Sequence, residues 1–162
     1  MAAGRAFDHI PLVNIAPLLG DNLEARKAVA REMEKAASEV GFLYVTGHGI
    51  APELIKNLQS RAAAFFALPD DVKKKYYIGN SRAHRGYVPM GEENFYSGDV
   101  PSVDKKEAFD LSIDLAEDDP DHIKGYRLLG PNQWPAEVEG FKEDIYAYYE
   151  AAISLGRTLF RG

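Results

Sequence analysis

Cysteine is absent from the 162 residues of this chain. Its absence excludes disulfide bonds, thiolate nucleophiles and zinc or iron–sulfur centres held by cysteine. Long apolar runs are missing too: the longest, Ala62–Leu68, spans seven residues, whereas a membrane-crossing helix needs about 20. Residues Met1–Leu12 include charged side chains and do not have the apolar centre of a secretory signal. Together these features predict a cytoplasmic protein.

Excess positive charge is also lacking. The chain has 19 Lys and Arg residues against 25 Asp and Glu residues, which gives a net charge of −6 and an isoelectric point near 5.2. A negative net charge disfavours binding to nucleic-acid phosphates and to anionic membranes. The hydrophobic fraction of 46% and the aromatic fraction of 11% are typical of a folded globular protein, and the length is that of one domain or part of one.

The common catalytic motifs are missing as well. There is no glycine-rich phosphate-binding loop, no G-x-S-x-G turn around a nucleophilic serine and no H-E-x-x-H zinc motif. A mononuclear iron site of the facial-triad type needs His-x-Asp or His-x-Glu and a distant histidine. The residues two positions after the four histidines are Pro11, Ile50, Gly86 and Lys124. We therefore expect this chain alone to hold neither a metal ion nor a catalytic centre.

The patterning of the N-terminal third predicts a strand, a helix and a second strand. Residues Ile10–Ile15 favour a short strand, and Asp21 is a suitable N-terminal cap for a helix that Gly41 ends. Apolar residues recur along that helix at helical spacing, and charged residues fill the other positions. Phe42–Thr46 is a compact β-favouring run that precedes a turn at Gly47-His48-Gly49.

The middle of the chain changes from helical to extended patterning. A second helix is predicted to begin at Pro52, followed by a short charged helix that extends to Lys75. His84–Met90 has the pattern of an extended segment, and Gly91–Asp104 has the composition of a surface loop. Lys106–Leu115 alternates in polarity and predicts a half-buried strand, with an apolar face formed by Phe109, Leu111 and Ile113.

The last third contains the clearest helical periodicity. Its apolar residues recur every three or four positions and form one stripe: Val138, Phe141, Ile145, Tyr148, Ala152, Leu155 and Leu159. A stripe of about six turns is longer than a small α+β unit covers, so we expect part of it to be exposed. We therefore expect this helix, residues 138–159, to bind a missing C-terminal half or a second copy of the chain.

The segment His84-Arg85-Gly86-Tyr87-Val88-Pro89 is the strongest candidate for a binding site. It places a histidine, an arginine and a tyrosine on one extended stretch beside a long loop, an arrangement suited to an anionic or zwitterionic substrate. The structural alternative is an edge strand in which Arg85 forms a surface ion pair.

Three other sets of polar residues have both a functional and a structural interpretation. His48 is either a catalytic base on a loop or the centre of a tight glycine turn. Asp118, Asp119 and Asp121 are either ligands for a divalent cation or a solvated turn, and they lack the spacing of an EF-hand. The side chains of Glu92-Glu93 point to opposite faces of an extended segment, so they do not act as an acid–base pair, although one of them can line a pocket.

Six short segments, spread in order over nearly the whole chain, carry a family resemblance: Ile10–Ile15, Gly41–Ile50, Phe65–Pro69, Arg85–Tyr87, Lys106–Asp110 and Gly130–Pro135. In register with one another, they resemble the N-terminal half of the isopenicillin N synthase-like, iron(II)- and 2-oxoglutarate-dependent oxygenases. Gly47 stands where the family usually has asparagine before His-Gly.

The resemblance implies an α+β fold in which N-terminal helices and strands, here residues 1–162, support a C-terminal double-stranded β-helix, or jelly roll. Family members bind Fe(II) through a His-x-Asp and a distal histidine, and 2-oxoglutarate through an Arg-x-Ser, all in that C-terminal half. This chain contains neither motif. The resemblance therefore implies a truncated dioxygenase whose catalytic core is largely missing, with Fe(II) and 2-oxoglutarate bound by the complete protein and not by this chain alone.

The resemblance also implies which residues reach the substrate. By position these are His84, Tyr87 and Val88, with Arg85 and Glu93 as further candidates. The complete protein would then be an oxidoreductase that acts on a small organic molecule by hydroxylation, desaturation or cyclisation. The alternative is a stand-alone, non-enzymatic binding module derived from this fold.

Overall fold

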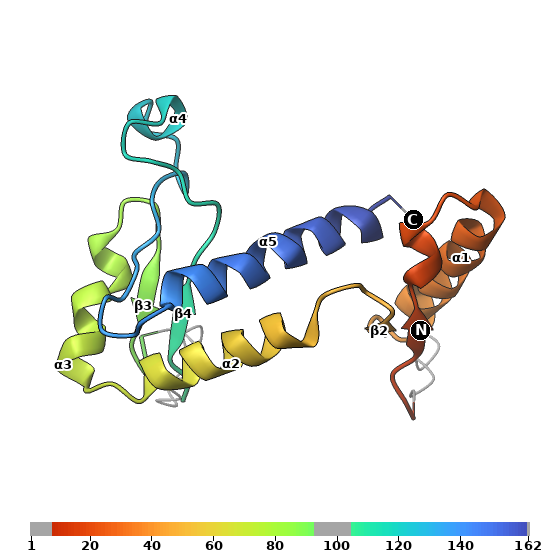
Figure 1. Ribbon diagram of the computed structural model, residues 1–162, viewed down its shortest axis with the longest axis horizontal. Helices are drawn as coiled ribbons and strands as arrows, with labels where there is room; N and C mark the ends of the chain where they lie inside the picture. The colour runs from red at the N-terminus through yellow and green to blue at the C-terminus, as the bar shows by residue number, and fades with distance from the viewer. Residues whose placement is uncertain (1–7, 93–104, 162) are drawn as a thin grey trace, which may run out of the picture. The chain divides into compact units, whose positions relative to one another are not determined.

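The computed structural model describes residues 8–92 and 105–161, and it contains both helices and strands (Figure 1). Contacts divide the chain into two compact units, Met1–Ile55 with Tyr148–Gly162, and Lys56–Ala147. No helix in the described ranges is long and apolar enough to cross a membrane. In chain order the strands, α-helices and 3₁₀ helices are β1 (Leu12–Asn14), η1 (Ala16–Leu19), α1 (Leu23–Glu39), β2 (Tyr44–Thr46), α2 (Pro52–Phe66), α3 (Asp70–Lys73), η2 (Lys74–Tyr76), η3 (Ile78–Asn80), β3 (Gly86–Val88), β4 (Ala108–Asp110), α4 (Pro120–Ile123) and α5 (Phe141–Leu159).

The first unit is built on a β-α-β arrangement. β1 and β2 are parallel, with Val13 opposite Val45, and α1 is the crossover helix that parallel neighbours require. Burial of apolar side chains stabilises this arrangement, because it removes their surface from water. The buried cluster consists of Val13, Ile15, Leu18 and Val29, with Met33, Leu43, Val45, Leu155 and Leu159 packed against it.

The N-terminal cap of α1 is Asn22, so the prediction of Asp21 is wrong. Asn22 is extended, with ψ of 102°, and its side chain accepts a hydrogen bond of 3.1 Å from the Ala25 backbone N–H. The Asn22 carbonyl also accepts the first helical bond, from Arg26 at 3.0 Å. Asp21 therefore lies one residue too early to cap. The predicted end is confirmed, because Gly41 has φ of +85°, a conformation that glycine adopts without steric cost.

Gly47 follows β2 in a left-handed conformation, with φ of +66°. A side chain at this position would collide with Asn14 and with Ala16. Asparagine tolerates the same backbone region better than most residues, but its Cβ would require Asn14 and Ala16 to move, so glycine is the residue that fits this turn as it stands.

The second unit is organised around Phe65, whose side chain is fully buried. β3 and β4 are antiparallel and place Tyr87 opposite Phe109 on this aromatic core. Most of the aromatic contacts are edge-to-face, the geometry that the ring quadrupoles favour. The ring centroids of Phe66, Tyr76, Tyr87, Phe109 and Phe141 lie 5.4, 6.4, 5.9, 5.0 and 5.5 Å from that of Phe65.

The strand predicted over Lys106–Leu115 is shorter in the structure, where β4 spans three residues. Phe109 and Leu111 pack against the aromatic core as expected, but the side chain of Ile113 is 48% exposed. The prediction of one continuous apolar face is therefore wrong at Ile113. β3 supplies only three pairing residues, so the chain beyond Asp110 is not held in a strand ladder.

The apolar stripe over residues 138–159 is divided between two clusters. Val138 precedes α5 and is buried with Phe141 and Ile145 in the core of the second unit. Leu155 and Leu159 pack in the first unit. All seven residues of the stripe are buried or half-buried, so the expectation that part of it would be exposed is wrong. That expectation assumes a single apolar core, whereas the helix contributes to two.

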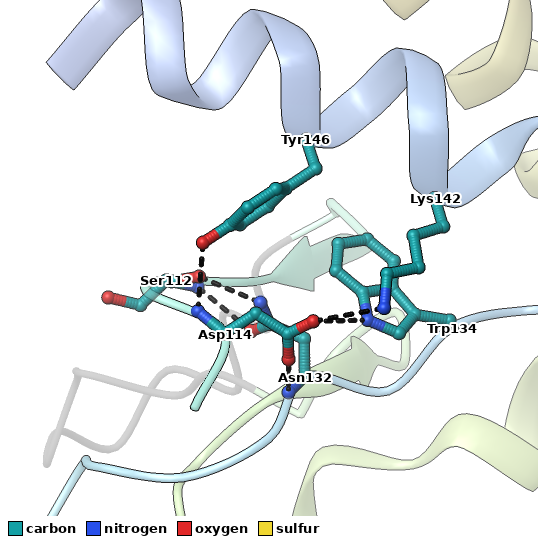
Figure 2. A network of polar contacts seen from close by, with 6 residues as sticks. All are labelled: Ser112, Asp114, Asn132, Trp134, Lys142 and Tyr146. Carbon is teal, nitrogen blue, oxygen red and sulfur yellow. Dashed lines mark hydrogen bonds and ion pairs between the residues drawn. The ribbon is translucent and has the colours of Figure 1, made fainter. Parts of the chain in front are cut away.

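A polar network attaches the segment after β4 to the 131–134 loop and to α5 (Figure 2). The carboxylate of Asp114 accepts hydrogen bonds from the Asn132 backbone N–H at 2.8 Å and from the Trp134 indole at 3.0 Å. It also pairs with the Lys142 ammonium at 3.2 Å. Burial opposes ionisation of Asp114, but these partners outweigh it and hold the pKa of the carboxyl below its usual range.

The remaining members of the network satisfy backbone groups where the strand ladder has ended. The Asn132 side chain donates to the Ser112 carbonyl at 2.7 Å and accepts from the Ser112 N–H at 3.0 Å. The Asp114 N–H donates to the Tyr146 hydroxyl at 3.1 Å. Side chains thus replace the missing ladder partners of this segment.

We predict that Asp114→Ala destabilises the fold by about 2–4 kcal/mol, because it leaves the N–H groups of Asn132 and Trp134 without their acceptor. Urea unfolding monitored by tryptophan fluorescence and circular dichroism measures the change. Asp118→Ala is the matched control: this exposed carboxylate should alter stability by no more than about 0.5 kcal/mol. Equal stability losses in the two variants would contradict the assigned role of Asp114.

Candidate functional site

The candidate segment, residues 84–89, comprises one exposed residue, four buried ones and the half-buried Pro89. His84 is exposed and has a left-handed backbone, with φ of +57°. Arg85, Tyr87 and Val88 are 6%, 2% and 5% exposed, and Gly86 is buried as well. Glu93 lies outside the described residues. In the described part of the segment, His84 is therefore the candidate whose side chain is most accessible to a ligand.

Arg85 bonds to backbone carbonyls and not to a carboxylate. Its guanidinium donates to the carbonyls of Ala83 at 2.6 Å, His84 at 3.2 Å and Leu128 at 2.6 Å. The surface ion pair considered for Arg85 is therefore wrong, because the side chain is buried. Its Nε is buried without a hydrogen-bond partner among the described residues. Arg85 thus fixes the 126–130 loop against β3, and its own charge has no acidic partner in that part of the chain.

Tyr87 belongs to a compact ionic cluster with Glu107 and Lys73. The Tyr87 hydroxyl donates to Glu107 Oε2 at 2.6 Å, and Lys73 Nζ lies 2.7 Å from the same oxygen. Lys73 is 5% exposed and stands 5.3 Å from the centroid of the Tyr87 ring. A second carboxylate, that of Asp70, lies 3.1 Å from Lys73. The cluster neutralises a buried ammonium and fixes the rotation of the Tyr87 ring.

The electrostatics of this cluster keep both ions charged. The hydrogen bond to Glu107 outweighs burial and raises the pKa of Lys73 above its ordinary range. Burial alone would raise the pKa of Glu107, but the bonds from Lys73 and Tyr87 prevail and lower it. Burial and the bond to Glu107 raise the pKa of Tyr87, so this phenol is a hydrogen-bond donor and not a base at neutral pH.

Sequence reasoning missed the pairing of Lys73 with Glu107. Lys73 lies in a run of charged residues, which is typical of a solvated helix, and no periodicity identifies the one lysine that turns inward. Glu107 belongs to one of the six segments that carry the family resemblance. That membership is the one feature of the sequence that draws attention to Glu107.

The other candidates have local structural roles. His48 Nδ1 accepts a hydrogen bond of 3.1 Å from the Ile50 N–H, between left-handed Gly47 and Gly49, as expected for the tight-turn interpretation. Asp119 caps α4 by accepting from the Asp121 N–H at 2.9 Å. The described ranges, which include all four histidines, contain no group of three His, Asp or Glu side chains arranged to hold a metal ion. These residues therefore do not fit an iron facial triad.

A surface pocket of about 420 Å³ lies beside the far end of the candidate segment. Its lining includes Pro89 and Glu92, and the Tyr77 hydroxyl donates to Glu92 at 2.5 Å. Lys74 and Asn80 complete the lining, and none of His84, Arg85, Tyr87 and Val88 contributes to it. The described candidate residues thus lie on β3 or directly before it, and the structure does not gather them around this pocket.

The sequence matches a family described as "non-haem dioxygenase in morphine synthesis N-terminal" over residues 10–137. The chain belongs to this family. The resemblance drawn from six short segments is therefore confirmed, and both strands of the candidate region, β3 and β4, lie within the matched range of this dioxygenase N-terminal region.

Individual relatives agree with the family assignment. The 2-oxoglutarate-dependent dioxygenase citB from Monascus ruber is 35% identical over 152 residues, which cover 91% of this chain and 45% of the relative. Two solved structures are similar in fold. A 2OG-Fe(II) oxygenase family protein from Caulobacter crescentus has a TM-score of 0.73 at 26% identity, and the match covers 93% of this chain and 46% of that protein. A full-length Neurospora crassa protein in complex with alpha-KG has a TM-score of 0.72 at 25% identity, and the match covers 94% of this chain and 45% of that protein.

We predict that Glu107→Ala destabilises this dioxygenase N-terminal region by about 3 kcal/mol, because it leaves the buried Lys73 ammonium with the exposed Asp70 carboxylate and a long, 3.4 Å bond to the Phe66 carbonyl. The double variant Lys73→Met with Glu107→Leu should recover much of the loss, since it removes both charges. Thermal and urea unfolding measure both effects. Lys75→Ala breaks an exposed pair with Glu137 and should leave stability almost unchanged. Unchanged stability of Glu107→Ala would refute the cluster as a structural determinant.

Proposed function

We propose that this chain is the N-terminal part of a non-haem iron(II), 2-oxoglutarate-dependent oxygenase that oxidises a small organic substrate. One observation carries the proposal: the family match over residues 10–137, whose named relatives are 2-oxoglutarate-dependent dioxygenases. The similarity in fold to a 2OG-Fe(II) oxygenase and to a protein bound to alpha-KG supports it. The chain spans about half the length of the curated relatives it matches.

In this proposal the jelly-roll core, with the ligands for Fe(II) and 2-oxoglutarate, belongs to a further part of the complete protein. When bound, those groups supply the oxidising chemistry. Residues of the present chain have a different task, which is to position the substrate and to exclude water from one side of the pocket. Tyr87 and Val88 suit this task because burial and the Glu107 hydrogen bond fix them in place. His84 suits direct contact because its side chain is exposed.

Two of the histidines bond singly to backbone groups. His122 Nδ1 bonds to the Leu129 carbonyl at 3.0 Å, and His48 accepts from the backbone. No step of the oxidation is therefore assigned to a residue of this chain. Its contribution is geometric: β3 is held by pairing with β4, by Arg85 and by the cluster around Glu107.

We predict that the 162-residue chain alone neither binds Fe(II) at one defined site nor forms succinate from 2-oxoglutarate above a metal-only blank, because it lacks a facial triad. Anaerobic Fe(II) titration and a succinate assay test this, with the full-length dioxygenase citB from Monascus ruber as the positive control. Stoichiometric iron binding by the chain alone would contradict the prediction.

The decisive test of the proposed function is the coding sequence that follows residue 162, together with the activity of the protein it encodes. A continuation that contains His-x-Asp, a distal histidine and Arg-x-Ser, and that forms succinate, supports the oxygenase. A coding sequence without them favours the stand-alone binding module.

For the complete protein we predict that His84→Ala raises KM for the organic substrate about tenfold and leaves KM for 2-oxoglutarate within about twofold, because its side chain is exposed and this proposal assigns its segment to the substrate side of the pocket. Tyr87→Phe is the companion variant, which removes only the hydroxyl bonded to Glu107 and should change the same KM less. Steady-state kinetics for both co-substrates measure the changes. Equal losses toward both co-substrates, in a variant that melts like the parent, would argue against substrate contact by His84.

We further propose that α5, which forms most of the helix predicted over residues 138–159, contributes to association, either with the remaining part of the protein or with a second copy. Two large apolar side chains near its end are exposed, Ile153 at 38% and Phe160 at 96%. We predict that the chain alone shows a concentration-dependent mass in light scattering, and that Phe160→Glu abolishes this dependence. Ser154→Glu, an exposed position on the same helix, is the control. A constant monomer mass at all concentrations would exclude self-association.

A further inference from the structure

A second concave site lies in the unit formed by residues 56–147, between the turn that precedes β3 and the loop that follows α4. It encloses about 220 Å³ and is lined by Arg82, His122, Gly125, Tyr126, Arg127 and Leu129. Gly125 is left-handed, with φ of +77°, and a Cβ built on it would lie 3.9 Å from the Arg82 guanidinium. The chain reversal at Gly125 therefore brings Arg82 against a loop that contributes a second arginine.

The positive charge at this site has no partner among the residues that the structure describes. Neither Arg82 nor Arg127 forms a side-chain hydrogen bond or an ion pair with any residue in the described ranges 8–92 and 105–161. The neighbouring acidic turn does not neutralise them: Asp119 caps α4, and Asp121 pairs with Lys124 at 3.6 Å. Two arginines thus line one small concavity, and neither is engaged by another described residue.

A third arginine, Arg85, is bonded to the loop that lines this site. Arg85 is 6% exposed, and in the described chain its guanidinium donates to backbone carbonyls, including that of Leu128 at 2.6 Å. Leu128 lies between the lining residues Arg127 and Leu129. The buried cation is therefore hydrogen-bonded to the loop that forms the site.

The walls of the site are held in place before any ligand arrives. His122 Nδ1 donates to the Leu129 carbonyl at 3.0 Å, which ties the end of α4 to the far side of the loop. Gly130 packs so closely that a Cβ would stand 2.7 Å from His122 Nδ1 and 3.0 Å from the Ala83 side chain. Preorganised walls reduce the entropic cost of binding.

We propose that this site binds the phosphate group of a small molecule. Paired guanidinium groups recognise compact oxyanions through charge-assisted, bidentate hydrogen bonds, and the Tyr126 hydroxyl supplies another donor. A volume of about 220 Å³ suits a small phosphorylated group, and the net charge of −6 opposes binding of a nucleic-acid polyanion. The site does not depend on the proposed oxygenase function.

Isothermal titration of the 162-residue chain with inorganic phosphate, at constant ionic strength, tests the proposal. We expect saturable binding of one phosphate per chain, which Arg82→Gln and Arg127→Gln each weaken at least about tenfold. Arg127→Lys keeps the charge but loses bidentate geometry, so it should bind more weakly than the parent. Arg157→Gln, an exposed arginine on α5, is the control with the same change in charge and should bind like the parent.

The same titration contains the outcomes that overturn the proposal. Absence of saturable binding by a folded parent chain refutes the site. An equal weakening by Arg157→Gln reveals attraction to overall charge instead of a local site. Succinate that binds as tightly as phosphate, through the same arginines, refutes the assignment to a phosphate group. Circular dichroism of each variant verifies that the substitutions at these exposed residues leave the fold intact.

Discussion

Exclusion of one phenyl ring from water organises the second unit. Phe65 has no exposed surface, and rings from α2, η2, β3, β4 and α5 surround it. The two strands pair over only three residues each, which is too few for an independently stable hairpin. Their position is therefore set by the aromatic core beneath them, and with it the position of the candidate residues on β3.

Polar contacts around that core fix the orientation of side chains on β3, which hydrophobic burial alone does not determine. Burial fixes which face of β3 turns inward, but an apolar contact has no preferred direction. The Tyr87–Glu107–Lys73 cluster and the carbonyl contacts of Arg85 add direction, because hydrogen bonds and ion pairs require particular geometry. The second unit thus carries two kinds of constraint on one short strand, which fix both its buried face and the direction of its side chains.

Local signals predicted α1, α2, α3 and α5 and the order of the strands, but not the short helix α4, and the six segments predicted the family. Pro52 and Gly41 mark helix ends through backbone restrictions that are visible in the sequence itself. Partners distant in sequence were not predictable in this way: nothing near Lys73 or Asp114 identifies Glu107 or Asn132 as its contact. Arg85 shows the same limit, since a buried guanidinium bound to carbonyls and an exposed one in an ion pair look identical in sequence.

The backbone at His84 restricts how evolution or engineering can vary this position. A φ of +57° places a Cβ-bearing residue in the left-handed region, where glycine, asparagine, aspartate and histidine are tolerated far better than β-branched side chains. Valine, isoleucine and threonine would force the turn between Ser81 and β3 to rearrange, regardless of any contact they made with a ligand. Few residue types are therefore compatible with this exposed position. The backbone geometry sets this limit, independently of any ligand that the side chain contacts.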